Sequence, residues 1–580
     1  MKKNMVSHRL DLVAMKKVPA DLVVMNAVLF HAFTGEFLNG RSLWIKDGWI
    51  AYAGPDAHPA TDENTRVIDV AGKVLIPGLI EAHTHILNLT GIEEFVRHII
   101  PSGTTTVVTE STELASVAGV DGIKYFAEGL RDQPIRCLYT LSPLCAISES
   151  LEERVPSNDD LIPFLNDPRC LGIGEIYWGN MLLENRQGQR VRTLARKALQ
   201  LGKRVEGHSA GASGNKLQAY TSLGVSSCHE PITEQEVLER LRLGYWVMIR
   251  QGAIRKELEG VQGIFDRPID KRRLILCTDS VDPEGLLAAG SLDAAVRDAL
   301  TLGVSPSLVY QMVTLNAAEH FRLDHVLGSL SPGKRADMVV IPSPEDFSPV
   351  MVFCEGRVLF QDGRNLVEPR KAPFPDHFFQ TVKVSQTPPI TVPKRGKVRA
   401  IELVTRLVTR ETVVDLEDQW EPGSLNQALA IDRTGSGEHF LGFLKGFGLR
   451  RGACGSTMCW DTQDMILLGC DEISMNTAIE RLKEIGGGAV YAVGKKVLAE
   501  FPAPLCGIVS LAPLEAARDQ ISRFEAALKQ NGVPWENPLL TLNTQGNAAI
   551  PHFRLTRHGY VRMKDREVLS LTVSEGQERV

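Results

Sequence analysis

Strand-like and helix-like segments alternate through residues 78–325, and this alternation restricts the possible fold more than any other feature of the chain. Short runs rich in Val, Ile and Thr are each followed by a segment whose apolar residues recur with a helical period. Alternation over roughly 250 residues predicts a parallel (β/α)8 barrel, in which functional groups lie at the carboxyl ends of the strands.

Residues that can bind metals stand at those predicted strand ends. The apolar run 74–86 is predicted as one strand, and it contains His83 and His85, which share a face because strand side chains alternate. Later strands end at four more residues of this kind, namely Glu175, His208, His229 and Asp279. Each could alone be structural, and Asp279 could cap a helix. Together they predict a binuclear metal centre, in which a bridging carboxylate offsets the repulsion between two cations.

Composition excludes several classes of function. The 580 residues carry a formal net charge of −6 and no basic run, so nucleic acid is not an expected partner. The ten cysteines form no CxxC pair, which is typical of a reduced compartment. No uncharged apolar stretch is long enough to cross a bilayer, and no signal peptide is recognisable. We therefore expect a cytoplasmic protein that binds no membrane.

The barrel is predicted to be inserted into a smaller β domain. Strand patterns in residues 1–77, with a hairpin turn at Lys46–Gly48, return in residues 326–366, so both parts are assigned to one composite β-sandwich domain. Residues 367–397 are proline-rich and predict a linker. A mixed α/β domain follows in residues 398–580, where a helix over 475–485 ends at three glycines before a strand.

Two motifs resemble the amidohydrolase superfamily. The segment 77–85, Pro-Gly-Leu-Ile-Glu-Ala-His-Thr-His, resembles its opening signature, and 328–340 resembles its return into the β domain. More narrowly, the chain resembles bacterial adenine deaminases over nearly its whole length. The matching segments are 103–108, Gly174-Glu175, Glu206-Gly-His208, Cys228-His-Glu230, Cys277-Thr-Asp279 and, in the C-terminal domain, 446–453 and 480–488.

The resemblance implies a role for each predicted ligand. His83 and His85 would bind a first metal, His208 and His229 a second, and Glu175 would bridge them, where many relatives have a carboxylated lysine. Asp279 would bind a metal and shuttle a proton, and Glu175 and His229 belong to the same catalytic set. The family uses iron, manganese or zinc, and histidine with carboxylate suits all three. A homodimer is also implied by the relatives alone.

The implied reaction is hydrolysis of adenine to hypoxanthine and ammonia. Metals lower the pKa of a bridging water, and Asp279 carries its proton from the attacking hydroxide to the leaving nitrogen. The same parts would open another cyclic amide, a lactam or an amino-heterocycle, which stands as an alternative. A non-catalytic metal-binding relative is a second alternative, although all six ligands are present. The glycines of 446–452 lack the spacing of a dinucleotide-binding loop.

Four motifs differ from the adenine deaminases where the substrate is expected to bind. His-Ile-Glu-Ser-Ser is replaced by 85–89, Asp-Pro-His-Glu by 110–113, Asp-Arg-His-Pro after the aspartate by 280–283, and His-Asp-Ser-His by 460–463. A site that loses hydrogen-bond partners for a purine can lose several powers of ten in rate. The residues predicted to contact substrate are Leu87, Glu110, Glu113, Tyr177, Trp178, Glu230, Ser280, Asp282, Trp460 and Asp461.

Overall fold

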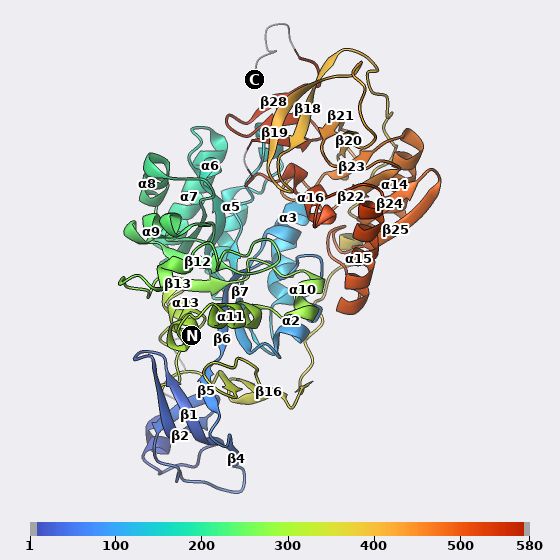
Figure 1. Cartoon of the computed structure of the whole chain (residues 1–580). Helices are drawn as coiled ribbons and strands as arrows, with labels where there is room; N and C mark the ends of the chain where they lie inside the picture. Colours follow the sequence, from blue (N-terminus) through green and yellow to red (C-terminus); the bar gives the residue numbers. More distant parts are fainter. Residues whose placement is uncertain (1–8, 551, 574–580) are drawn as a thin grey trace.

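A computed structural model describes residues 9–550 and 552–573. Three bodies follow one another along the molecule (Figure 1): a composite β sheet at one end, a barrel in the middle and a C-terminal α/β domain at the other end. In the described part of the chain, no helix combines the length and the apolar character that a membrane span requires.

The composite sheet joins segments from both sides of the barrel. Its strand order is β17-β16-β15-β14-β5-β1-β2-β3, with β4 beside β1. The bounds are β1 Leu22–His31, β2 Glu36–Lys46, β3 Trp49–Gly54, β4 Arg66–Asp69, β5 Val74–Pro77, β14 Met338–Ile341, β15 Met351–Cys354, β16 Arg357–Gln361 and β17 Arg364–Asn365. The predicted hairpin turn is confirmed, because Asp47 and Gly48 both have positive φ, at 51° and 75°, between β2 and β3.

The barrel contains eight parallel strands. Five are hydrogen-bonded in the order β10-β9-β8-β7-β6 and three in the order β11-β12-β13. The ring closes where Ser226 N donates to Val205 O (3.0 Å) and Asp279 N donates to His83 O (3.0 Å). The bounds are β6 Leu79–Thr84, β7 Thr104–Glu110, β8 Arg136–Leu141, β9 Cys170–Tyr177, β10 Arg204–His208, β11 Ser227–Cys228, β12 Trp246–Arg250 and β13 Leu274–Cys277. The predicted barrel fold is confirmed.

Helices cover the outside of the barrel. In α2, Ile92, Phe95, Val96 and Ile99 are buried with the spacing of one helix face. The bounds are α2 Ile92–Ile99, α3 Thr112–Gly129, α4 Glu149–Glu152, α5 Asn158–Leu161, α6 Trp178–Met181, α7 Arg186–Gln200, α8 Gly214–Ser222, α9 Glu234–Arg242, α10 Pro283–Ala288, α11 Leu292–Thr301, α12 Pro306–Met312 and α13 Leu315–His320. Between β12 and β13 stands only a 3-10 turn, Gln262–Phe265.

The single strand predicted over 74–86 is wrong. The chain leaves the composite sheet after β5 and enters the barrel at β6, with Gly78 between them. A Cβ at Gly78 would lie 2.2 Å from Thr105 Oγ1, so glycine lets the backbone pass close to β7. Because both strands are fully buried, the apolar run continues across the break, and periodicity could not reveal the change of sheet.

The C-terminal domain is built on an eight-stranded sheet of order β19-β18-β21-β20-β23-β22-β24-β25, with a three-stranded sheet, β26-β27-β28, beside it. Gly486, at φ 74°, follows α14 and gives the predicted helix stop. The bounds are β18 Lys397–Leu403, β19 Thr409–Asp415, β20 Leu425–Ile431, β21 His439–Lys445, β22 Ala453–Ser456, β23 Met465–Gly469, α14 Glu472–Glu484, β24 Gly488–Val493, β25 Lys496–Pro502, α15 Leu514–Gln530, α16 Pro538–Asn543, β26 Phe553–Thr556, β27 Gly559–Arg562 and β28 Glu567–Leu569. The predicted domain boundaries stay a prediction.

Candidate metal centre

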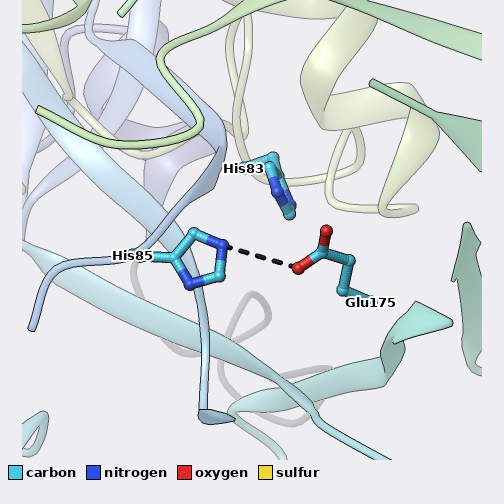
Figure 2. A group of neighbouring side chains, drawn as sticks. All are labelled: His83, His85 and Glu175. Carbon is cyan, nitrogen blue, oxygen red and sulfur yellow. Dashed lines mark ion pairs between the residues drawn. The ribbon is translucent and has the colours of Figure 1, made fainter. Parts of the chain in front are cut away.

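The six predicted ligands converge at the carboxyl ends of the barrel strands. His83 lies in β6, one position before the end of the strand, and His85 follows the strand directly. Glu175 lies in β9, and His208 ends β10. His229 directly follows β11, and Asp279 is the second residue after β13. Three groups have ligand atoms within 4.8 Å of one another, namely His83/His85/Glu175, Glu175/His208/His229 and His83/His229/Asp279. Figure 2 shows the first of these groups, with His85 facing the Glu175 carboxylate. Glu175, His83 and His229 each belong to two of these groups, and Glu175 is the carboxylate among the three.

The ligand side chains make short contacts around two carboxylates, Glu175 and Asp279. His208 Nδ1 lies 2.5 Å from Glu175 Oε1, and His229 Nε2 lies 3.2 Å from the same oxygen. On the other side, His83 Nε2 lies 3.0 Å from Asp279 Oδ1, and His85 Nε2 lies 3.7 Å from it. His229 Nε2 is buried without a hydrogen-bond partner of good geometry. Imidazole and carboxylate donors gathered in this way fit divalent manganese, iron or zinc.

Asp279 stands in strained backbone. Its φ is 58°, in the left-handed region that a non-glycine residue rarely adopts, and such strain is concentrated at functional sites. Its Oδ2 accepts a hydrogen bond from Arg250 Nη1 (3.1 Å). Burial alone would raise the pKa of Asp279, but His229, His83 and Arg250 outweigh it and hold that pKa below its usual value. Asp279 is therefore ionised at neutral pH and can accept a proton.

Carboxylates outside the ligand set hold the ligand rings. Glu113 Oε1 lies 2.6 Å from His85 Nδ1, which leaves Nε2 of that ring to face the centre. A carboxylate behind a metal-binding histidine fixes its tautomer and its orientation. Glu113 was predicted to contact substrate, and it does line the cavity described below, but its carboxylate is already engaged with His85.

Glu110 is buried beneath the centre and does not line that cavity. It accepts hydrogen bonds from Thr140 Oγ1 (2.6 Å) and Glu175 N (3.2 Å), and it lies 3.7 Å from His83 Nδ1. Burial raises the pKa of Glu110 to about 8. In this structure Glu110 supports the strand that presents Glu175, and its predicted contact with substrate stays a prediction.

Sequence reasoning missed two residues at the centre. Arg250 ends β12 and forms an ion pair with Glu230 (Nη1 to Oε1, 2.5 Å), which in turn lies 3.3 Å from His229 Nε2. Glu81 is buried in β6, accepts hydrogen bonds from Thr278 N and His83 N, and has its pKa raised to about 8 by burial. Both carried a usable signal, because Arg250 ends a predicted strand and Glu81 shares the period of His83 and His85.

A cavity of about 200 Å³, the metal-site cavity, opens beside this centre. The barrel contributes His85, Glu175, His208, Glu230, Arg250 and Asp279. The C-terminal domain covers it with residues that include Met458, Trp460, Asp461, Gln463, Asn543 and Asn547. Of the predicted substrate contacts, it is lined by Leu87, Glu113, Tyr177, Glu230, Ser280, Trp460 and Asp461.

Asp461 links the two domains at this cavity. Its carboxylate accepts hydrogen bonds from Ala548 N (2.6 Å) and from the hydroxyl of Tyr177 (3.4 Å). Burial raises the pKa of Asp461 to about 7. The C-terminal domain thus lines the site. In the sequence, only the family resemblance predicts this, because nearly 300 residues of chain separate Tyr177 from Asp461.

Trp178 and Asp282 do not line the metal-site cavity. The Trp178 indole Nε1 donates to Ala210 O (2.8 Å), and Asp282 caps α10 by accepting a hydrogen bond from Gly285 N (2.7 Å). Neither position supports the predicted substrate contact. Asp282 is instead where a helix of sequence Pro-Glu-Gly-Leu needs a cap.

Asp282→Ala should lower the free energy of unfolding by about 1 kcal/mol, because the cap on α10 is lost. Urea denaturation measures this, with the exposed Glu284→Ala as the matched control, for which the change should stay within about 0.5 kcal/mol. A raised KM without any loss of stability would instead restore a substrate contact for Asp282.

The comparisons with known proteins agree with this geometry. Residues 74–359 match the amidohydrolase family, and residues 402–567 match the adenine deaminase C-terminal domain. The fold and the site therefore define a metal-dependent hydrolase that acts on carbon–nitrogen bonds other than peptide bonds.

Relatives extend the match to the whole chain. Adenine deaminase 2 of Carboxydothermus hydrogenoformans is 32% identical over 580 residues, covering 97% of this chain and 98% of its own length. Adenine deaminase of Desulfatibacillum aliphaticivorans is 32% identical over 96% of this chain and 98% of its own. Adenine deaminase of Cereibacter sphaeroides is 32% identical over 95% of this chain and 97% of its own length. The chain belongs to the adenine deaminase family.

Proposed function

We propose that this protein hydrolyses adenine to hypoxanthine and ammonia with two divalent ions, which are manganese, iron or zinc. The observation that carries the proposal is the pair of ligand groups that share Glu175, placed beside a cavity covered by the C-terminal domain. Two further carboxylates, Glu113 and Glu230, contact the ligand histidines beside the guanidinium of Arg250. Bound dications would offset this excess of acidic groups.

In this proposal, His83 and His85 would hold one ion, His208 and His229 would hold the other, and the carboxylate of Glu175 would be shared between them. When bound, the ions supply Lewis acidity that makes water nucleophilic near neutral pH. Asp279 accepts a proton from the attacking water and returns it to the exocyclic nitrogen, which leaves as ammonia while oxygen replaces it on C6. Arg250 holds Asp279 and Glu230 in place from behind.

The cavity wall also has groups that suit a purine. Carboxamides of Asn88, Asn543 and Asn547 line it, and a carboxamide both donates and accepts hydrogen bonds, as the edge of adenine requires. Trp460 provides an aromatic face for stacking. These groups stand in for the histidine and arginine that the resembling motifs carry, so a changed motif does not exclude adenine.

A second candidate is hydrolysis of another cyclic amide, lactam or amino-heterocycle. The observation that favours it is the apolar part of the same wall, which includes Leu87, Met458, Trp460, Ile508 and Ile550. The test is incubation of manganese- or iron-loaded protein with adenine, followed by measurement of ammonia and hypoxanthine. Equal amounts of both products support the proposal, whereas turnover only of lactams or cyclic ureides supports the second candidate. Binding without turnover of either class would indicate a non-catalytic relative.

Trp460 also lines a second cavity of about 240 Å³, which lies against α10 and α15. The wall between this cavity and the metal-site cavity is formed by Trp460 with Asn88, Leu89, Ile254 and Asn543. Trp460→Ala should raise the KM for adenine about 5- to 150-fold, because stacking on one base is lost. It should also admit larger N6-substituted purines, because the two cavities would join. Steady-state kinetics measure both effects, with Trp420→Ala as the control, since Trp420 lies away from the cavity and donates to Asp415 O. An unchanged KM would exclude stacking on Trp460.

The homodimer and the cytoplasmic location stay predictions. Gel filtration with light scattering, and fractionation of the cells of origin, measure them directly.

A further inference from the structure

A third cavity of about 280 Å³, the basic cavity, shares a wall with the metal-site cavity. Ser116, Asp461 and Gln463 line both. Gln463 Nε2 donates to Ser116 Oγ (2.8 Å), so the two side chains close the wall between the barrel helix α3 and the C-terminal domain. The basic cavity is therefore a separate space in contact with the proposed active site.

The basic cavity is lined by four cationic side chains and one carboxylate: Arg154, Lys383, Arg433, Arg557 and Asp461. Two of the cations are neutralised by acids behind them. Arg557 pairs with Asp432 and Asp464, and Arg154 pairs with Asp432 (3.2 Å) and Glu438 (2.8 Å). These pairs leave Arg433 and Lys383 as the groups whose charge faces the cavity.

Arg433 is only 1% exposed and still has no carboxylate within 4 Å in residues 9–550 and 552–573. Its guanidinium donates to Thr457 O and to Gln463 Oε1, both at 3.3 Å. Burial lowers the pKa of Arg433 only to about 10, so the side chain stays charged at neutral pH. A buried charge without a counter-ion is strongly unfavourable, and a ligand that supplies the counter-ion removes that penalty.

Lys383 lines the same cavity. Its side chain is exposed, and the described part of the chain offers it no ion-pair partner. Its backbone N donates to Arg433 O (2.7 Å), so the two residues are fixed next to each other. Two unpaired cations favour a dianion over a singly charged carboxylate, and the planar guanidinium suits two oxygens of one phosphate group.

We propose that the basic cavity is a binding site for a phosphate group, held by the buried guanidinium of Arg433 and the ammonium of Lys383. Adenine and hypoxanthine carry no such group, so the ligand is distinct from the proposed substrate and product. Bound phosphate competes with Gln463 Oε1 for Arg433 Nη2, and Gln463 also lines the metal-site cavity. The site thus connects phosphate binding to the wall of the proposed active site.

Calorimetric titration of the metal-loaded protein, after removal of free metal, tests the proposal with inorganic phosphate and with ribose 5-phosphate. Both probes carry the group, and the tighter of the two identifies whether the ligand is the free anion or an ester. Arg433→Gln should weaken binding about 10- to 100-fold, because a charge-assisted pair of hydrogen bonds is lost. Arg433→Lys should fall between Arg433→Gln and the unsubstituted protein, since it keeps the charge without the planar fork.

The matched control is Arg272→Gln, which removes the same charge from a side chain that is 78% exposed and should leave the affinity unchanged. Lys383→Gln gives a test that does not depend on folding around a changed buried residue, and it should weaken binding about 3- to 5-fold as an exposed charge is lost. If neither probe binds at a ligand concentration of 10 mM, the proposal is overturned. Equal affinity in the protein and in Arg433→Gln would also overturn it, because phosphate would then be bound elsewhere, for example at the metals.

Discussion

Asp279→Asn is expected to reduce kcat for adenine by about 100- to 10,000-fold, the usual contribution of a positioned proton-transfer group. The amide cannot accept the proton of the attacking water, whereas it keeps the size of the side chain and its contacts with Arg250 and His83. KM should change little in comparison, because the loss falls on the chemical step. Steady-state kinetics, followed by the absorbance change from adenine to hypoxanthine, measure both constants.

The matched control is Asp266→Asn, which makes the same change at an exposed position and should leave both constants unaltered. Metal content of the Asp279→Asn protein must be measured beside its activity. A variant that keeps its metals and yet turns over adenine at the full rate would rule out Asp279 as the proton carrier.

His208→Ala is expected to give the second large loss, of at least about 100-fold in kcat, together with loss of one ion per chain. His208 is one of three residues in its ligand group, and even changes behind a metal ligand cost 10- to 100-fold in metal affinity or activity. Its Nδ1 also contacts Glu175 at 2.5 Å, so the bridging carboxylate loses a neighbour.

The exposed His325 offers the matched control, and His325→Ala should keep two ions and full activity. Elemental analysis after exhaustive dialysis reports the ions, and initial rates report the activity. Two retained ions in His208→Ala would remove His208 from the ligand set, whatever happened to the rate.

Much of the barrel and of the metal centre could be predicted from local pattern. His83 and His85 were found from the period of a strand, and Glu175, His208 and Asp279 from the rule that functional groups follow strand ends. The rule worked because a parallel barrel brings all carboxyl ends to one rim, so position along each strand is enough and long-range contacts need not be known. Arg250 obeys the same rule and could have been included.

Other features depend on contacts that a local pattern does not contain. The break between β5 and β6 at Gly78 lies in a continuous apolar run, so periodicity alone predicts one strand there, although the predicted domain boundary falls between residues 77 and 78. Glu110 ends β7 and Glu113 lies in the first turn of α3, where a metal ligand or a substrate contact is also expected. Only the position of the His85 ring shows that Glu113 orients a ligand. Likewise, Asp282 follows Asp279 closely but turns to cap α10.

The central claim is that these side chains hold a pair of ions that make water reactive, and a metal titration of the apoprotein tests it most directly. Manganese is added in steps to chelator-treated protein, and bound metal and the rate of ammonia release from adenine are measured on the same samples. The account predicts that binding saturates at two ions per chain and that the rate rises until that point. Full activity in the chelator-treated protein would contradict it. So would a titration in which the protein binds no manganese.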